Sequence, residues 1–82
     1  MPEYRVWAIR NIPDEPKYYE VVSPTDGADL INRMARKDLR NKNIESNAFG
    51  LEVLEDGEWS EWYSDEGDDI DVLADERWEL SK

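Results

Sequence analysis

The residues of this chain that could do chemistry are mostly carboxylates, and they stand among tryptophan and tyrosine in its second half. Glu52 and Glu61 lie on either side of the dipeptide Asp56-Gly57, and a facing pair of carboxyl groups can act as general acid and general base. The chain has no histidine and no cysteine, so it lacks the commonest general base and the thiolate metal ligands. We therefore expect no catalytic residue and no cofactor, and a small enzyme remains only an alternative.

The acidic run 65–71 invites comparison with a calcium-binding loop. If Asp65 takes the first position of an EF-hand, acidic residues also fall at three of the later ligand positions. However, Gly67 occupies the third position, where a side-chain oxygen is required, and Ile70 occupies the sixth, where glycine is needed. We therefore expect a solvated acidic loop without metal ligands, and a small metal-binding protein remains an alternative.

Two runs of alternating polar and apolar residues flank Asp56-Gly57 and predict a β-hairpin, because this dipeptide tolerates the positive φ of a tight turn. A two-residue turn sets Glu52 opposite Glu61, where like charges repel mildly. One face of the hairpin then faces the core and carries Phe49, Leu51, Val53 and Trp62. The opposite face carries Glu52, Leu54, Trp59, Glu61 and Tyr63. A three-residue turn with a glycine bulge would exchange the two faces.

The second face, the turn and the acidic loop that follows form the predicted partner-binding surface. Aromatic anchors bordered by carboxylates suit a basic protein surface. The residues assigned to this surface are Glu52, Glu55, Glu58, Trp59, Glu61, Tyr63, Asp65 and Glu66. The alternative is that the aromatic residues only fill a thin core, since each of them buries a large area.

The net charge of −11 is unevenly distributed along the chain. Residues 1–42 hold eight Lys or Arg against seven Asp or Glu, a net +1, whereas residues 43–82 hold two against fourteen, a net −12. Such a field repels nucleic acid and anionic membranes and attracts basic proteins, so direct nucleic-acid binding is not expected. Acidity that serves solubility or a high-salt cytoplasm is the alternative. No apolar run is long enough to span a membrane, and we expect a cytoplasmic protein that is a monomer or a weak homo-oligomer.

The first half of the chain predicts a second hairpin followed by a helix. Residues 4–10 and 17–23 are rich in strand formers, and the two prolines between them prevent both helix and ladder pairing. Ser23 is a good N-cap and Pro24 suits the first helical position, so we expect the helix to begin at Pro24 and to end at 41–43. Its apolar stripe is expected to pack on the sheet and consists of Leu30, Ile31, Met34 and Ala35, with Ala28 and Leu39 at the edges.

Three further expectations concern single positions and one cluster. Trp7 and Trp62 are predicted to belong to the core, and Gly50 is predicted to make room for the ring of Tyr63. The basic residues of the helix are Arg33, Arg36, Lys37 and Arg40, followed by Lys42. They are interpreted as a solvated face, with contact to phosphate, to an acidic partner or to the protein's own hairpin as alternatives.

These elements predict a single small α+β domain over residues 1–82. The expected arrangement is ββαββ, a small antiparallel sheet of two hairpins with one helix packed on one face. Ile70, Leu73 and Trp78 have helical spacing, but residues 77–80 would also suit a short edge strand. The tail after about residue 72 is therefore left open as helix, strand or loosely ordered chain.

The string 47–53, together with 56–63 and 67–71, resembles small, acidic, uncharacterised proteins of bacteriophages and prophages. The resemblance implies a protein that binds host machinery inside the host cell, in some cases as an acidic mimic of DNA. It carries no catalytic motif. Our expectation is a non-enzymatic interaction protein, phage-encoded, that binds a basic protein surface as a nucleic-acid mimic or inhibitor. A structural or assembly protein that self-associates is the alternative.

Overall fold

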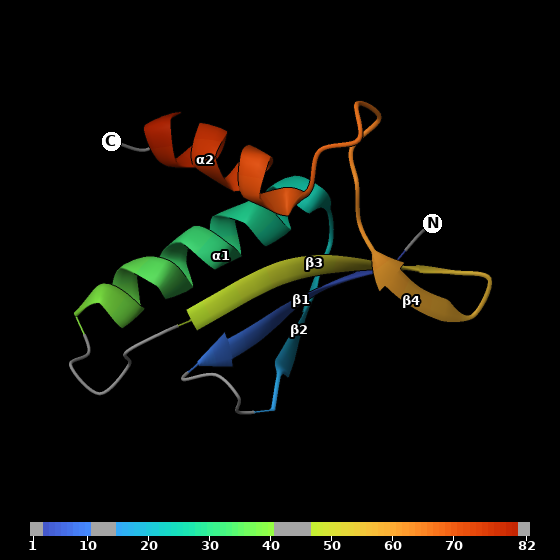
Figure 1. The fold of residues 1–82 in the computed structure, drawn as a ribbon, viewed down its shortest axis with the longest axis horizontal. Coiled ribbons are helices and arrows are strands. Elements are labelled where there is room, and N and C mark those ends of the chain that lie inside the picture. The colour runs from blue at the N-terminus through green and yellow to red at the C-terminus, as the bar shows by residue number, and fades with distance from the viewer. Residues whose placement is uncertain (1–2, 11–14, 41–46, 81–82) are drawn as a thin grey trace.

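The computed structural model describes residues 3–10, 15–40 and 47–80, and it shows an α+β fold with a four-stranded antiparallel sheet and two helices (Figure 1). In chain order the elements are β1 (Glu3–Arg10), β2 (Lys17–Val21), α1 (Pro24–Leu39), β3 (Asn47–Glu55), β4 (Glu58–Glu61) and α2 (Ile70–Leu80). The α+β class is confirmed. The expected ββαββ arrangement with one helix is incomplete, because a second helix follows β4.

The sheet has the strand order β2-β1-β3-β4, so the two hairpins join through their first strands. β1 pairs with β3 over its whole length and sets Val6 opposite Leu51. The β3 and β4 register sets Glu52 opposite Glu61, as the two-residue turn predicts. This turn places Asp56 and Gly57 at φ 53° and 80°, the positive values that a tight hairpin requires. The predicted register of this hairpin is confirmed.

Helix α1 begins at Pro24, as predicted, because two side-chain hydrogen bonds to backbone amides stabilise its start. The Ser23 hydroxyl accepts a hydrogen bond from the Asp26 amide at 3.1 Å, and the Asp26 carboxylate accepts one from the Val22 amide at 3.2 Å. Ser23 therefore belongs to the cap, and β2 ends at Val21 rather than at Ser23. The helix ends at Leu39, and the predicted end at 41–43 lies outside the described residues, as does Lys42.

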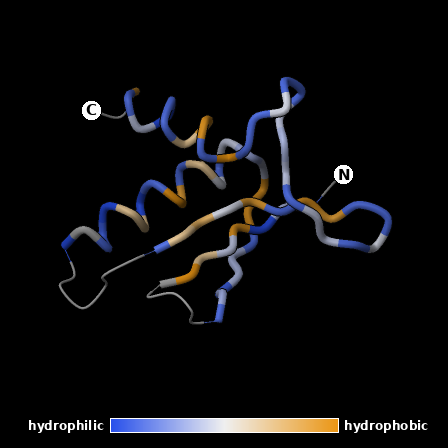
Figure 2. Tube along the Cα trace, viewed as in Figure 1, coloured by the Kyte–Doolittle hydropathy of each residue, from blue (hydrophilic) through white to orange (hydrophobic). Residues whose placement is uncertain are grey.

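The core lies between the sheet and the two helices, which cover the same face (Figure 1). Its buried members come from β1, β3 and both helices, and they are Val6, Ala8, Ala28, Ile31, Met34, Leu51, Ile70 and Ala74. Phe49 and Trp62 are partly buried and pack against this cluster, so their predicted side of the hairpin is correct. Figure 2 shows hydrophobic and hydrophilic positions alternating along α1, and hydrophilic chain at the hairpin turn and in the loop before α2.

The C-terminal segment, for which the sequence did not decide between helix, strand and loosely ordered chain, forms helix α2. Ile70 and Ala74, one turn apart, are both buried against the core, and Leu73 packs beside them. The Asp69 carboxylate accepts a hydrogen bond from the Asp71 amide at 3.1 Å and so caps the first turn. None of the helices in the described ranges is long and apolar enough to cross a membrane.

Two predictions about single positions are wrong. Trp7 is not a member of the core under the helices; it is half-buried, and its place in β1 beside the buried Val6 and Ala8 turns it to the opposite face of the sheet. It lies directly over Gly50 of β3, its partner in the ladder. A Cβ atom at Gly50 would lie 2.2 Å from the Trp7 Nε1 atom, so this glycine makes room for Trp7 rather than for Tyr63.

Candidate functional site

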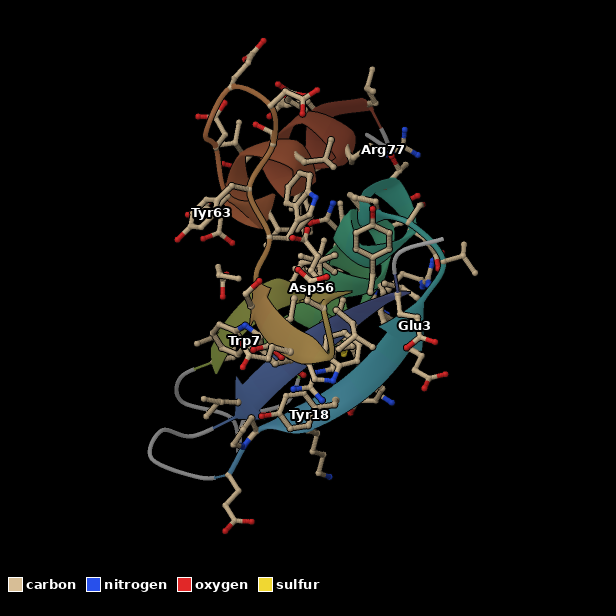
Figure 3. All side chains as sticks on the ribbon, turned by 90° about the vertical axis from the view of Figure 1, so that its right-hand side faces the viewer. Glu3, Trp7, Tyr18, Asp56, Tyr63 and Arg77 are labelled. Carbon is tan, nitrogen blue, oxygen red and sulfur yellow. The ribbon has the colours of Figure 1, made fainter. Side chains whose placement is uncertain are left out.

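The face of the sheet away from the helices carries a network of aromatic and charged side chains drawn from all four strands. At its centre the Arg5 guanidinium lies between two rings, 4.0 Å from the centroid of Tyr18 and 4.2 Å from that of Trp59. Arg5 Nε also donates a hydrogen bond to Glu52 Oε1 at 2.7 Å. We call these four residues the Arg5 stack. In Figure 3, Tyr18 lies on the side of the sheet opposite the helices.

The Arg5 stack changes the role expected of Glu52. Each cation–π contact at a site of this exposure contributes about 0.5–1 kcal/mol, and the ion pair is partly shielded, since the two side chains are 23% and 21% exposed. The charge of Glu52 is therefore paired within the protein. The predicted position of Glu52 opposite Glu61 is correct, and its negative charge still acts on Glu61.

Glu61 lies beside the stack and is bonded to Trp7. The Trp7 indole N–H donates a hydrogen bond to the Glu61 carboxylate, and this bond alone would lower the pKa. Burial nevertheless raises the pKa of Glu61 above its usual value, and the negative charges of Glu52, Asp69 and Asp71 raise it further. The ionised form of Glu61 is therefore disfavoured mainly by burial, and nearby carboxylates add to this effect.

The remaining predicted site residues lie at the hairpin turn and in the loop that precedes α2. Glu55 and Glu58 are exposed and face each other across the turn. Tyr63 is 60% exposed, and in Figure 3 it lies beside the loop, apart from Tyr18 and Trp7. Asp65 and Glu66 are exposed as well.

The loop itself is held in one shape by Ser64. Its hydroxyl accepts hydrogen bonds from the amides of Glu66 at 3.3 Å and Asp68 at 3.1 Å, and its own amide donates to the Asp68 carbonyl at 2.8 Å. Gly67 adopts a φ of 87° and donates its amide to the Ser64 carbonyl. The acidic side chains of the loop are thus presented from an ordered turn.

The two acidic segments lie at one end of the molecule, and the basic part of α1 points to the other. Figure 1 shows the hairpin turn and the loop at one end of the long axis and the C-terminal half of α1 at the other. We define the acidic end as Glu55, Asp56, Glu58, Asp65, Glu66, Asp68 and Asp69. The basic residues of α1 therefore do not neutralise the hairpin, which corrects one interpretation of that cluster.

The basic residues of α1 belong instead to the junction with α2. The Arg36 guanidinium lies 4.5 Å from the ring centroid of Trp78, and Arg33 lines a cleft of about 310 Å³ between the two helices. In this cleft both ends of the Arg77 fork bind the Asp29 carboxylate, at 2.9 and 3.0 Å. This ion pair lowers the pKa of Asp29.

The predicted site residues are thus divided among three places. Glu52, Trp59 and Glu61 lie on the face of the sheet away from the helices, which we call the open face. Glu55 and Glu58 lie at the turn, and Tyr63, Asp65 and Glu66 lie on the loop. The sequence-based prediction missed Arg5, Trp7 and Tyr18, which come from the other hairpin. Alternation along β1 places Arg5 and Trp7 on one face, but the pairing of β1 with β3 was needed to bring them to the site.

Within the described ranges, no group of three or more acidic side chains converges as metal ligands would. Comparison of the chain with protein-family models, with curated proteins and with solved structures gave no match. Any function proposed for this chain therefore rests on the site itself, and the resemblance to phage proteins stays a prediction.

Proposed function

We propose that this chain is a non-enzymatic interaction protein whose acidic end binds a basic protein surface. The observation that carries the proposal is the crowding of exposed carboxylates in the hairpin turn and the loop, which lie away from the C-terminal half of α1 (Figure 1). A local excess of negative charge attracts a basic partner to the acidic end and raises the association rate.

The aromatic residues of the hairpin and the loop provide the short-range contacts. Tyr63, next to the acidic end, is 60% exposed, and Trp59 is half-buried in the Arg5 stack. Large aromatic side chains of this kind are frequent energetic centres of protein interfaces. Charge would then govern the rate of capture, and the aromatic residues the lifetime of the complex.

A narrower version of this proposal concerns the partner. A basic protein surface that normally holds nucleic acid is the natural target of an acidic mimic, and the resemblance to phage proteins favours a protein of the host. Glu52 contributes little to such mimicry because its charge is paired with Arg5. The carboxylates that remain available are those of the turn and the loop.

The proposal is tested by two charge reversals that change the net charge equally. Glu58→Lys lies at the acidic end, whereas Glu15→Lys lies just before β2, beyond the opposite ends of the strands. The partner is first isolated on the immobilised protein at low salt, and its binding kinetics are then measured across a salt series. Glu58→Lys should slow association by roughly two- to tenfold and Glu15→Lys much less. Equal effects of both variants, or none, would show that the acidic end does not direct binding.

A second candidate function is self-association, and the free edge of β2 favours it. β2 has no strand on its outer side within the described part of the sheet, and an edge of five residues can pair with a second copy. Assembly of this kind depends little on salt, unlike electrostatic capture. Sedimentation velocity at two salt concentrations, in the absence of any partner, separates the two candidates.

A further inference from the structure

A groove of about 490 Å³ lies between the first turn of α1, the loop after β4 and the first turns of α2. Its apolar lining consists of Pro24, Trp62, Val72 and Leu73. Trp62 and Leu73 also pack against the core, so this part of the lining is fixed, whereas Val72 remains 41% exposed. An exposed valine beside a tryptophan offers a contact site for one aliphatic side chain.

The charged lining of the same groove is acidic, and the neutral polar residues Thr25 and Ser64 complete it. Its carboxylates are Asp65, Glu66, Asp68, Asp69 and Glu76, and no lysine or arginine among the described residues lines it. Asp69 already caps α2 through its carboxylate. In the part of the chain that the structure describes, Asp65, Glu66 and Glu76 form no ion pair, so their charge is available to a ligand.

Two carboxyl groups near the groove, Asp71 and Glu61, are affected by burial and by neighbouring carboxylates. Burial raises the pKa of Asp71, and the charges of Asp69 and Asp75 raise it further. The pKa of Glu61 is raised by burial and, among other charges, by Asp69 and Asp71. A cation placed in the groove would relieve this repulsion.

We propose that the groove binds a short peptide segment of the partner in which an aliphatic side chain stands next to arginine or lysine. The aliphatic group would contact Val72 and Trp62, and the cation would pair with Glu66 or Glu76 on the rim. This inference rests on the proposed function and names the structural element by which a basic partner is held. Nucleic acid does not fit the groove, because the carboxylates on the rim repel its phosphates. A purely apolar helix does not fit either, because it would leave these carboxylates without a cation.

The test uses the full chain labelled with ¹⁵N and three synthetic pentapeptides. The first peptide is Ac-Gly-Arg-Leu-Arg-Gly-NH₂, the second replaces its leucine by serine, and the third replaces both arginines by glutamate. The first should shift amide resonances of residues 62–76 in a saturable manner. The serine peptide should bind several-fold more weakly, since it loses the apolar contact, and the glutamate peptide should cause no shift.

Two valine substitutions distinguish a change inside the groove from a general change in the net charge of the protein. Val72→Lys places a cation inside the groove, and Val22→Lys makes the same change at a valine that is 86% exposed and outside it. Val72→Lys should weaken binding of the arginine–leucine peptide by about tenfold or more, and Val22→Lys by less than about threefold. Circular dichroism of both variants checks that the fold is retained.

The possible outcomes are distinct. Equal weakening by both variants would overturn the groove and leave only a general acidic field. Shifts confined to the hairpin turn would also overturn it, while the proposed capture by the acidic end would stand. Resonance shifts in residues 62–76 that depend on protein concentration alone would identify a second copy as the occupant, and so refute the peptide assignment.

Discussion

Gly50 is needed because a side chain at this position would collide with Trp7, and not because of its backbone conformation. The substitution Gly50→Ala therefore tests how Trp7 packs on the open face of the sheet. Its φ is not in the left-handed region, so Gly50→Ala is compatible with the strand. The new Cβ atom would lie 2.2 Å from both Nε1 and Cε2 of Trp7, well inside contact distance. The indole ring therefore has to move, and it gives up its hydrogen bond to Glu61.

The size and the sign of the effect depend on Trp7. Overpacking of this kind costs about 1–3 kcal/mol, whereas replacing glycine by alanine in a strand otherwise gains roughly 0.5–1 kcal/mol. With Trp7 present we expect a net loss of about 1–2 kcal/mol, which lowers Tm by roughly 5–15 °C in a domain of this size. In a Trp7→Thr background the same Gly50→Ala change should be neutral or stabilising.

The assay is urea denaturation followed by far-UV circular dichroism, for the wild type, both single variants and the double variant. Circular dichroism is preferred to fluorescence because Trp7 itself is removed. The double-mutant cycle should give a coupling energy of at least about 1 kcal/mol between the two positions. Equal destabilisation by Gly50→Ala in both backgrounds would refute the packing of Trp7 on Gly50.

Two further predictions concern the cap of α1 and the carboxyl group of Glu61. Ser23→Ala removes the hydroxyl that accepts from the Asp26 amide and should cost about 0.5–2 kcal/mol in urea denaturation; an unchanged midpoint would contradict the cap. The raised pKa of Glu61 means that ionisation disfavours the folded state, so stability is lost as pH rises through and above the usual value of 4.5. Glu61→Gln should therefore increase the free energy of unfolding at pH 7 and not at pH 3, and a gain of equal size at both would reject this explanation.

Local signals in the sequence predicted the local structure well. The N-cap at Ser23 and the turn at Asp56-Gly57 depend on short-range hydrogen bonds and dihedral angles, and both were found where expected. The hairpin faces followed from the register, so the buried position of Leu51 could be predicted too. These features require no knowledge of distant parts of the chain.

The features that the sequence did not predict depend on contacts between distant segments. Alternation along β1 cannot tell which face the helices cover, and Trp7 was assigned to the core simply because it is large and apolar. The partner of Gly50 was sought within its own hairpin, whereas it comes from β1. Helix α2 is weakly amphipathic, and its buried Ile70 and Ala74 became recognisable only against α1 and β3.

The central position of β1 has a consequence for how the protein folds during its synthesis. β1 and β2 are neighbours in the sequence and can pair early, but a two-stranded hairpin is marginal in water. The other side of β1 pairs with β3, which sets Glu3 opposite Leu54, so the sheet closes only after two thirds of the chain has been made. Closing this long loop costs entropy before the new contacts compensate for it, and the pairing of β1 with β3 is therefore the step expected to limit the folding rate. A ribosome-bound chain that stops before β3 would hold a hairpin and a helix whose shared apolar face still lacks Leu51, Ile70 and Ala74.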